Sequence, residues 1–165
     1  MAVYKRRVTR EKVLQALYAY ELSKEPISNV IENTLGELQK DAESFAFAKK
    51  LIQQVIQHED EVEERIKGKV AHWEFDRIAV IDRVLLRMGI CELLFFPDIP
   101  PKVTINESIE VAKIFSTENS GRFINGVLDA VLEDLKSSKT LHKEGRGLMD
   151  ETAETKAGQK LHKEK

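Results

Sequence analysis

The sequence has 165 residues, of which 42% are hydrophobic and 33% charged, and its formal net charge is −2. These values are typical of one soluble globular domain that is long enough to bury a core. No run of roughly 18 apolar residues and no apolar signal core occurs, which predicts a cytoplasmic protein without a membrane span. The single cysteine, Cys91, excludes an internal disulfide, and the four scattered histidines leave no zinc-ligand spacing.

The charges are distributed unevenly along the chain. Residues 1–20 carry five cations and one acid, a local charge of +4, whereas residues 21–136 carry 14 cations and 22 acids, a local charge of −8. Lysine and arginine gathered at one end release counterions from a polyanion, so the pattern predicts a phosphate-bearing partner for that end. A basic N-terminus that is merely solvated is the alternative.

Apolar residues recur at helical spacing over most of the chain, which predicts an all-α fold. Thr9 and Ser28 are in position to cap the first two helices. From Ala42 to about Ile66 the pattern predicts one long helix, or two in line with a break near His58.

A short connector then leads to the most apolar helix, expected over Asp76–Phe96. We expect Trp73 and Phe75 to pack the connector onto the core, and base stacking by Trp73 is the less favoured alternative. Asp82 and Arg83 are adjacent in sequence and do not face each other on a helix. Asp82 is therefore free for a cation of another molecule, or it forms a plain surface ion pair.

The stretch from Ile99 to Asp129 contains two predicted helix starts. Two prolines at its beginning are expected to exclude a helix there. Thr104 followed by Glu107 matches a capping box, in which each side chain accepts a hydrogen bond from an N–H of the first turn. A helix is therefore predicted from Ile105, and this assigns Glu107 a structural role.

A second helix is predicted after a short polar corner, with Ser120 as its N-cap. The corner places Asn119 and Arg122 beside Phe123, whose ring is either a core side chain or an outward contact. Gly126 lies inside this helix, where glycine costs about 1 kcal/mol relative to alanine. We therefore expect a neighbouring helix to approach closely at Gly126.

From Lys136 onward the apolar pattern is lost, and glycine, serine, threonine, lysine and glutamate dominate. We predict a helical domain over residues 1–136 and a polar, flexible, disordered tail over residues 137–165. If the tail is ordered, a neighbouring molecule or a partner is expected to hold it.

The sequence carries no signature of catalysis. It has no glycine-rich phosphate loop, nucleophile elbow, dinucleotide fingerprint or metal-binding histidine pair. We therefore predict a binding protein without enzymatic activity, cofactor or metal. The side chains that suit a nucleic acid lie at the basic end and at the polar corner: Arg6, Arg7, Arg10, Asn119, Arg122 and Phe123. RNA with unstacked bases suits them better than duplex DNA, because a ring stacks only on a base that has left its helix.

Four segments occur in a fixed order after an arginine-rich start: LQALYAYEL, DRVLLRMGICEL, VTINESIEVAKIF and FINGVLD. With them the chain resembles the NusB family of bacterial transcription antitermination factors over nearly all of residues 3–135. The resemblance implies a compact bundle of about seven helices in two packed sub-bundles. It also implies binding of the boxA element of ribosomal RNA leader transcripts jointly with NusE, a protein of the small ribosomal subunit. The family helps RNA polymerase to pass terminators, as part of an antitermination complex, and has no cofactor and no catalytic activity.

Residue roles follow from the resemblance position by position. It implies RNA contact by Arg6, Arg7, Arg10, Asn119, Arg122 and Phe123. Tyr18 and Asp82 match positions at the NusE contact, and Arg87 serves either surface. The family usually has an acid where this chain has Asn119, and losing that charge beside phosphates strengthens RNA binding if it has any effect.

Two other functions remain open at this point. The resemblance extends to the N-terminal module of certain ribosomal RNA cytosine methyltransferases, so the chain could be an enzyme's accessory RNA-binding domain. Those proteins continue into a catalytic domain, whereas this chain ends in a polar tail. The third reading is a structural homodimer whose basic end is incidental, since dimers occur in the family.

Overall fold

A computed structural model describes the backbone of residues 2–149 and the side chains of residues 5–149. This part of the chain contains α-helices, two short 3₁₀ segments and no strand. The elements are α1 Ala2–Ser23, α2 Ile27–Leu35, η1 Gly36–Lys40, α3 Ala42–Gln57, α4 Glu59–Lys67, α5 His72–Phe75, α6 Val80–Phe95, α7 Pro101–Phe115, α8 Glu118–Ser137 and η2 Gly145–Leu148. The prediction of an all-α fold is confirmed, and so is the break near His58, which separates α3 from α4.

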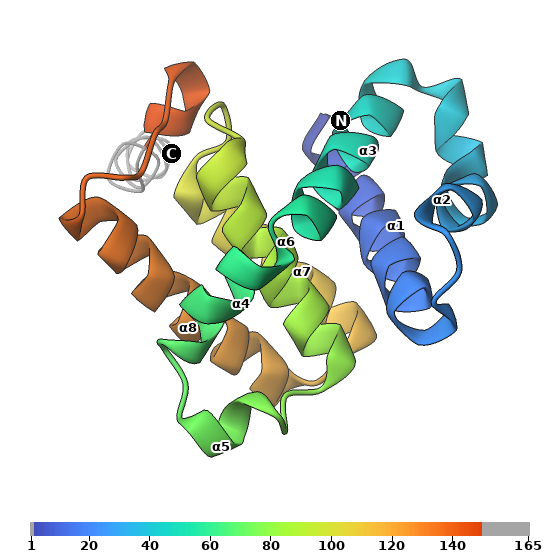
Figure 1. Ribbon diagram of the computed structural model, residues 1–165. Helices are drawn as coiled ribbons and strands as arrows, with labels where there is room; N and C mark the ends of the chain where they lie inside the picture. The colour runs from blue at the N-terminus through green and yellow to red at the C-terminus, as the bar shows by residue number, and fades with distance from the viewer. Residues whose placement is uncertain (1, 150–165) are drawn as a thin grey trace, which may run out of the picture.

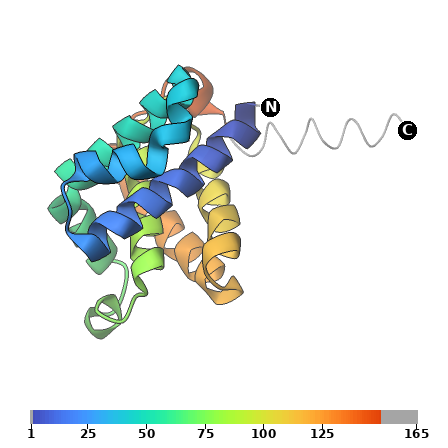
Figure 2. The same cartoon turned by 90° about the vertical axis from the view of Figure 1, so that its right-hand side faces the viewer.

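The helices form two sub-bundles, as predicted (Figure 1). In the first, α1 packs against α2 and α3; in the second, α6, α7 and α8 pack against one another, and α4 contacts α6. The sub-bundles are joined because α1 and α3 both contact α6, and α1 also contacts α7. Figure 2 shows α1 running across the face of the molecule where the two parts meet.

Helix α6 lies at the centre of the core. All of its residues from 84 to 93 are buried, and one apolar cluster extends from it into both sub-bundles. Gly89 permits the contact with α8, because a Cβ atom there would lie 2.9 Å from the Leu128 methyl groups. The close approach predicted at Gly126 is wrong, since that residue faces open space. Sequence alone shows that a helical glycine is costly, but only packing shows which glycine is needed.

The predicted caps of the first two helices are wrong. Helix α1 already begins at Ala2, so Thr9 lies inside it, buried, with its hydroxyl donating to the Lys5 carbonyl at 2.7 Å. A threonine within a helix can satisfy its hydroxyl in this way. Helix α2 begins at Ile27 after Pro26, and Ser28 is exposed on its first turn.

The capping box predicted at Thr104 is also wrong. Helix α7 begins at Pro101, where the missing N–H of proline has no intrahelical acceptor to lose. Thr104 and Glu107 therefore lie within α7, where both are buried and contact other helices. Helix α8 likewise begins earlier than expected: the Ser120 N–H donates to the hydroxyl of Thr117, which is the N-cap, at 3.1 Å.

The connector before α6 differs from the prediction at one of its two aromatic residues. Phe75 is buried, as expected, but the Trp73 residue is 62% exposed. Its predicted packing onto the core is therefore wrong, because the short helix α5 directs only one of the two rings inward.

The chain does not leave the body after α8. Residues 138–149, which we call the C-terminal strap, return to the end of α6. The Lys143 ammonium donates to the carbonyls of Glu92 and Phe96 at 3.2 and 2.9 Å, and the Glu144 N–H donates to the Pro97 carbonyl at 2.9 Å. The last carbonyls of a helix need such donors, so this chain itself, and not the expected partner, holds the strap. The predicted boundary at residue 136 falls inside α8, and residues 150–165 of the predicted tail lie outside the described residues.

Candidate nucleic-acid interface

The cations Lys5, Arg6, Arg7 and Arg10, which we call the basic arm, lie on the first turns of α1. Their side chains have very different exposures: 68% for Lys5, 34% for Arg7 and 4% for Arg10. The arm is therefore not a uniform charged surface. The contacts of each cation decide whether it can reach a ligand.

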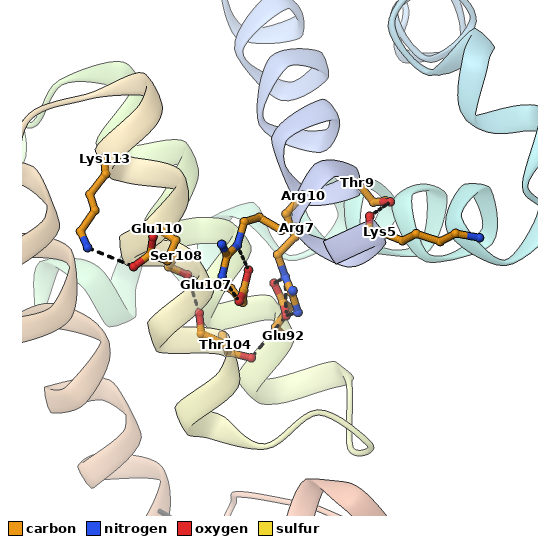
Figure 3. Close-up of polar contacts among 10 residues, drawn as sticks. All are labelled: Lys5, Arg7, Thr9, Arg10, Glu92, Thr104, Glu107, Ser108, Glu110 and Lys113. Atoms are coloured by element: carbon orange, nitrogen blue, oxygen red, sulfur yellow. Dashed lines mark hydrogen bonds and ion pairs between the residues drawn. The ribbon is translucent and has the colours of Figure 1, made fainter. Parts of the chain in front are cut away.

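Arg10 forms a buried ion pair with Glu92 of α6. The Arg10 Nη2 donates to Glu92 Oε1 at 2.6 Å, its Nε donates to Oε2 at 3.0 Å, and the Thr104 hydroxyl donates to the same carboxylate at 3.3 Å (Figure 3). Burial lowers the pKa of Arg10, but the Glu92 carboxylate outweighs it and the net shift is upward. Arg10 thus fixes α1 to α6 and α7, and its guanidinium does not lie at the surface for the RNA contact predicted from the sequence.

Arg7 forms a second ion pair, which joins α1 to Glu107 of α7. Its Nε and Nη2 donate to the two oxygens of Glu107 at 2.8 and 2.9 Å, and the hydrogen bond and charge of Glu107 raise the pKa of Arg7 (Figure 3). This two-point contact sets the direction of the guanidinium plane. Because the side chain of Arg7 is one-third exposed, its remaining N–H groups can donate to a bound phosphate.

Arg6 and Lys5 flank an open cleft of about 670 Å³. The Arg6 guanidinium lies 4.3 Å from the centroid of the Phe47 ring, and the Lys5 ammonium lies 3.4 Å from an oxygen of Asp41. Arg146 of the C-terminal strap also lines this cleft. Lys5 is exposed and Arg6 is partly exposed, so these two side chains belong to the part of the arm that a polyanion can reach.

The polar corner between α7 and α8 forms a second candidate surface. Asn119 is exposed, and the side chain of Arg122 is 79% exposed with Nη2 3.6 Å from Glu118. Phe123 packs against the core and is partly exposed, and its ring lines an open hollow of about 350 Å³. The two alternatives for Phe123 are thus combined, since one ring contacts the core and also faces the hollow.

Asp82 has a structural role at this corner. It is buried, and the hydroxyls of Ser116 and Ser120 donate to its two oxygens at 2.9 and 2.8 Å. The expectation that Asp82 is free for a cation of another molecule is therefore wrong, because both oxygens accept hydrogen bonds within the chain. The carboxylate joins α6 to the end of α7 and the start of α8, and it lines the hollow beside Phe123.

The other two predicted site residues lie apart from the corner. Tyr18 is on the surface of α1, where the residue is 36% exposed. The side chain of Arg87 is only 7% exposed and is surrounded by carboxylates: it pairs with Glu63, and its guanidinium lies 3.5 Å from Glu21 and 3.8 Å from Glu59. Arg87 thus joins α6 to α1 and α4.

Helix α7 connects the basic arm to the polar corner. Arg7 contacts Glu107 in its second turn, and Phe115 at its end leads into the corner. At 1.5 Å per residue, the eight steps between these positions span about 12 Å. A bound chain of a few nucleotides can therefore contact both surfaces.

Sequence reasoning missed the residues that hold these surfaces in place. Glu92 was given no role, although a lone carboxylate within the apolar run from Ile90 to Leu93 is a signal for a buried partner. Lys143 in the strap had no comparable signal. Burial lowers the pKa of its ammonium to about 8.

Among the described residues, no group of three or more histidine, cysteine, aspartate or glutamate residues could hold a metal ion. None of the helices between residues 2 and 149 has the length and apolar character needed to cross a membrane.

Comparison with known sequences gives a consistent family. A model of the NusB family matches residues 7–133. The transcription antitermination protein NusB of Chloroherpeton thalassium is 43% identical over 149 residues, covering 90% of this chain and 71% of that protein. The protein of the same name from Salinibacter ruber is 41% identical over 155 residues, covering 93% of this chain and 97% of its own.

Solved structures show the same arrangement of helices. T. maritima NusB superposes with a TM-score of 0.73 at 36% identity, covering 78% of this chain and 91% of that one. A chain from a crystal structure of antitermination factors NusB and NusE in complex with dsRNA gives a TM-score of 0.72 at 26% identity, covering 81% and 98%. The C-terminal strap begins after the last residue of the family match.

Proposed function

The chain belongs to the NusB family, and from this premise we propose that it is a transcription antitermination factor that binds boxA-type leader RNA together with NusE. It acts in the cytoplasm as part of an RNA polymerase antitermination complex that supports ribosomal RNA transcription. It binds macromolecules and catalyses no reaction, and it needs no cofactor. The solved relative with NusE and dsRNA supports both partners.

One observation carries this proposal: the accessible cations of the basic arm lie at one end of a helix on an acidic helical body. Lys5, Arg6 and Arg7 are on one end of α1, whereas residues 21–136 carry a local charge of −8. Cations gathered at one place bind phosphates with release of counterions. The ion pairs of Arg7 and Arg10 fix this end of α1 to α7 and α6, so that the exposed cations are held in place before RNA binds.

The predicted site residues divide into contact and positioning roles. In this proposal Arg6 and Arg7 bind phosphates, with Lys5 beside them, and the corner residues Asn119, Arg122 and Phe123 contact bases and phosphates. Arg10 and Arg87 act through the helices they join, because their side chains are buried. Tyr18 offers its exposed ring and hydroxyl to NusE, and Asp82 contributes to that contact by shaping the corner.

The salt dependence of RNA binding tests the proposal. The double variant Lys5→Ala/Arg6→Ala removes the two cations that flank the cleft, and we expect weaker binding of a boxA-type RNA with a slope against log salt concentration reduced by about two units. Lys49→Ala/Lys136→Ala is the matched control, since both lysines are exposed and lie on α3 and α8. Fluorescence anisotropy with and without NusE gives both quantities. Equal slopes for the two double variants would refute the proposal.

Self-association of the chain stays a prediction. A native mass measurement tests it, with and without an excess of NusE. A dimer that dissociates when NusE is added shares its surface with the partner, and one that persists in the complex uses a different surface.

A further inference from the structure

We propose that Trp73, together with Arg77, forms a second base-binding platform that extends the polar corner and receives an unpaired nucleotide of RNA. This inference rests on the proposed function and adds a site outside the residues assigned so far. It concerns the short helix α5 and the segment that follows it.

The exposure of Trp73 is the first observation. The residue is 62% exposed, although tryptophan is a large side chain that is usually well buried on average. By contrast, three phenylalanines, Phe47, Phe75 and Phe96, have at most 7% exposure. An exposed ring of this size offers a wide apolar face for a contact with another molecule.

The local structure holds this ring outward. Phe75, the last residue of α5, is buried, and the Lys67 ammonium lies 4.9 Å from the centroid of its ring. The Ala71 N–H donates to the Glu74 carboxylate at 3.3 Å, and this hydrogen bond stabilises the start of α5. Because α5 is attached through Phe75, Trp73 lies on the side of the turn that faces solvent. The indole is therefore available without any rearrangement of the fold.

Arg77 connects this ring to the polar corner. Its guanidinium lies 5.6 Å from the centroid of the Trp73 ring, and the same residue lines the hollow together with Asn119 and Phe123. Figures 1 and 2 both place α5 at the same end of the molecule as the corner between α7 and α8. The surface thus joins two aromatic rings through an arginine and an amide.

These groups match the chemistry of an unpaired RNA base. An indole face stacks on any base, and an arginine beside it adds a cationic contact to the base or a hydrogen bond to its phosphate. The hollow is also lined by Glu74 and Asp82, so it is not a purely cationic surface. The Asp82 oxygens already accept hydrogen bonds from two serines, but the Glu74 carboxylate can accept a further hydrogen bond from the amino group of a base. A base contact therefore fits better than a series of phosphate contacts.

A paired base does not fit this platform. In a duplex both faces of a base are already stacked on its neighbours, and a side chain can stack only on a base that has been unstacked. We infer that the nucleotide on Trp73 lies beside the one on Phe123 in a single-stranded segment.

Trp73 is the only tryptophan in the chain, so its emission reports directly on the platform. We would titrate the full chain with a single-stranded boxA-type oligonucleotide and follow both tryptophan emission and the anisotropy of a labelled RNA. Saturable quenching with the same Kd as the anisotropy is expected. The annealed duplex should leave the emission unchanged, and Trp73→Phe provides the blank.

Variants separate stacking from simple loss of a surface side chain. Trp73→Leu should weaken single-strand binding about tenfold, within the range for loss of one stacked base, and Trp73→Phe should retain most of the affinity. Leu22→Ala is the matched control, because Leu22 is 60% exposed at the far end of α1, and it should bind as the unmodified chain does. Thermal unfolding of each variant checks that the fold is kept.

Each outcome has a distinct meaning. If RNA binds with unchanged emission and Trp73→Leu has full affinity, the platform is refuted while the proposed function stands. If the emission responds to NusE alone and not to RNA, the ring is a protein contact and the inference is wrong. If no RNA binds to the chain with or without NusE, the proposed function fails, and the platform fails with it.

Discussion

The basic arm and the polar corner hold their exposed side chains in different ways. At the arm, two arginines of α1 reach carboxylates on other helices, and one of these ion pairs is buried with side-chain exposures of 4% and 2%. At the corner, one buried carboxylate accepts from the hydroxyls of Ser116 and Ser120. Removing one member of a buried ion pair is strongly destabilising, because the other charge stays buried without a partner. Removing one member of a network of hydroxyl groups leaves only a neutral group unsatisfied and costs less. The arm should therefore be the more fragile of the two.

The largest effect is expected from Glu92→Ala. This variant leaves the Arg10 guanidinium buried and without its carboxylate, and it also removes the acceptor of Thr104. Loss of one partner of a buried pair costs about 3 to 5 kcal/mol. Urea unfolding measures the loss. The exposed acid Glu118, whose side chain is 86% exposed, gives the control variant Glu118→Ala, for which we expect a change within about 0.5 kcal/mol.

A double variant separates the positioning role of Arg10 from an RNA contact. Arg10→Met/Glu92→Met replaces both buried charges by apolar side chains, a change that is often neutral or stabilising in other proteins. We expect it to be more stable than Glu92→Ala and to keep the salt slope of RNA binding. A slope reduced by about one unit in this folded variant would show that Arg10 contacts a phosphate directly.

The packing of α8 on α6 gives the next largest effect. Gly89→Ala places a methyl group 2.9 Å from the Leu128 side chain, and overpacking of this kind costs about 1 to 3 kcal/mol. Gly126→Ala is the matched control on the facing helix, where the new methyl meets open space and should stabilise the helix by up to about 1 kcal/mol. Unfolding of both variants should therefore change in opposite directions. Two changes of the same sign would contradict the close approach at Gly89.

These residues also show how far the sequence could predict the structure. Helical periodicity predicted the all-α fold, because the 3.6-residue pattern is a local property of the chain. The four sequence segments in their fixed order indicated the family. The roles of Thr104 and Glu107 could not be read in the same way. A polar side chain near a helix start can cap that helix or pair with a distant one, and only the packing of α1 and α6 onto α7 decides between them.

Prediction of the two surfaces from the sequence was limited in the same way. Arg6, Arg7 and Phe123 were predicted to contact RNA, and these roles stay predictions. It did not show that Arg10 and Arg87 are buried or that Trp73 is exposed. Burial depends on which helices cover a residue, and the arginine-rich start has the same charge whether its side chains point inward or outward.

The corner is expected to respond more moderately than the arm. Asp82→Ala leaves the hydroxyls of Ser116 and Ser120 without their acceptor, at a cost of about 1 to 3 kcal/mol for a partner left unsatisfied. Asp82→Asn retains an acceptor oxygen and should lose less stability. If the corner contacts RNA through Phe123, Asp82→Ala should weaken binding with little change in salt slope. A change in the slope without a change in affinity at low salt would contradict this role.

The last effect concerns the C-terminal strap and appears only over a limited range of pH. Burial lowers the pKa of Lys143 from 10.5 to about 8, so between these values the folded chain has released a proton that the unfolded chain still holds. Stability rises with pH wherever the unfolded state binds more protons, so the unmodified chain should gain stability over this interval relative to Lys143→Met, which cannot titrate. Below pH 8 the side chain is charged in both states, and the difference between the two proteins should no longer vary. Denaturant unfolding at a series of pH values measures this difference, and a constant difference from pH 8 to 10.5 would show that the strap leaves Lys143 in solvent.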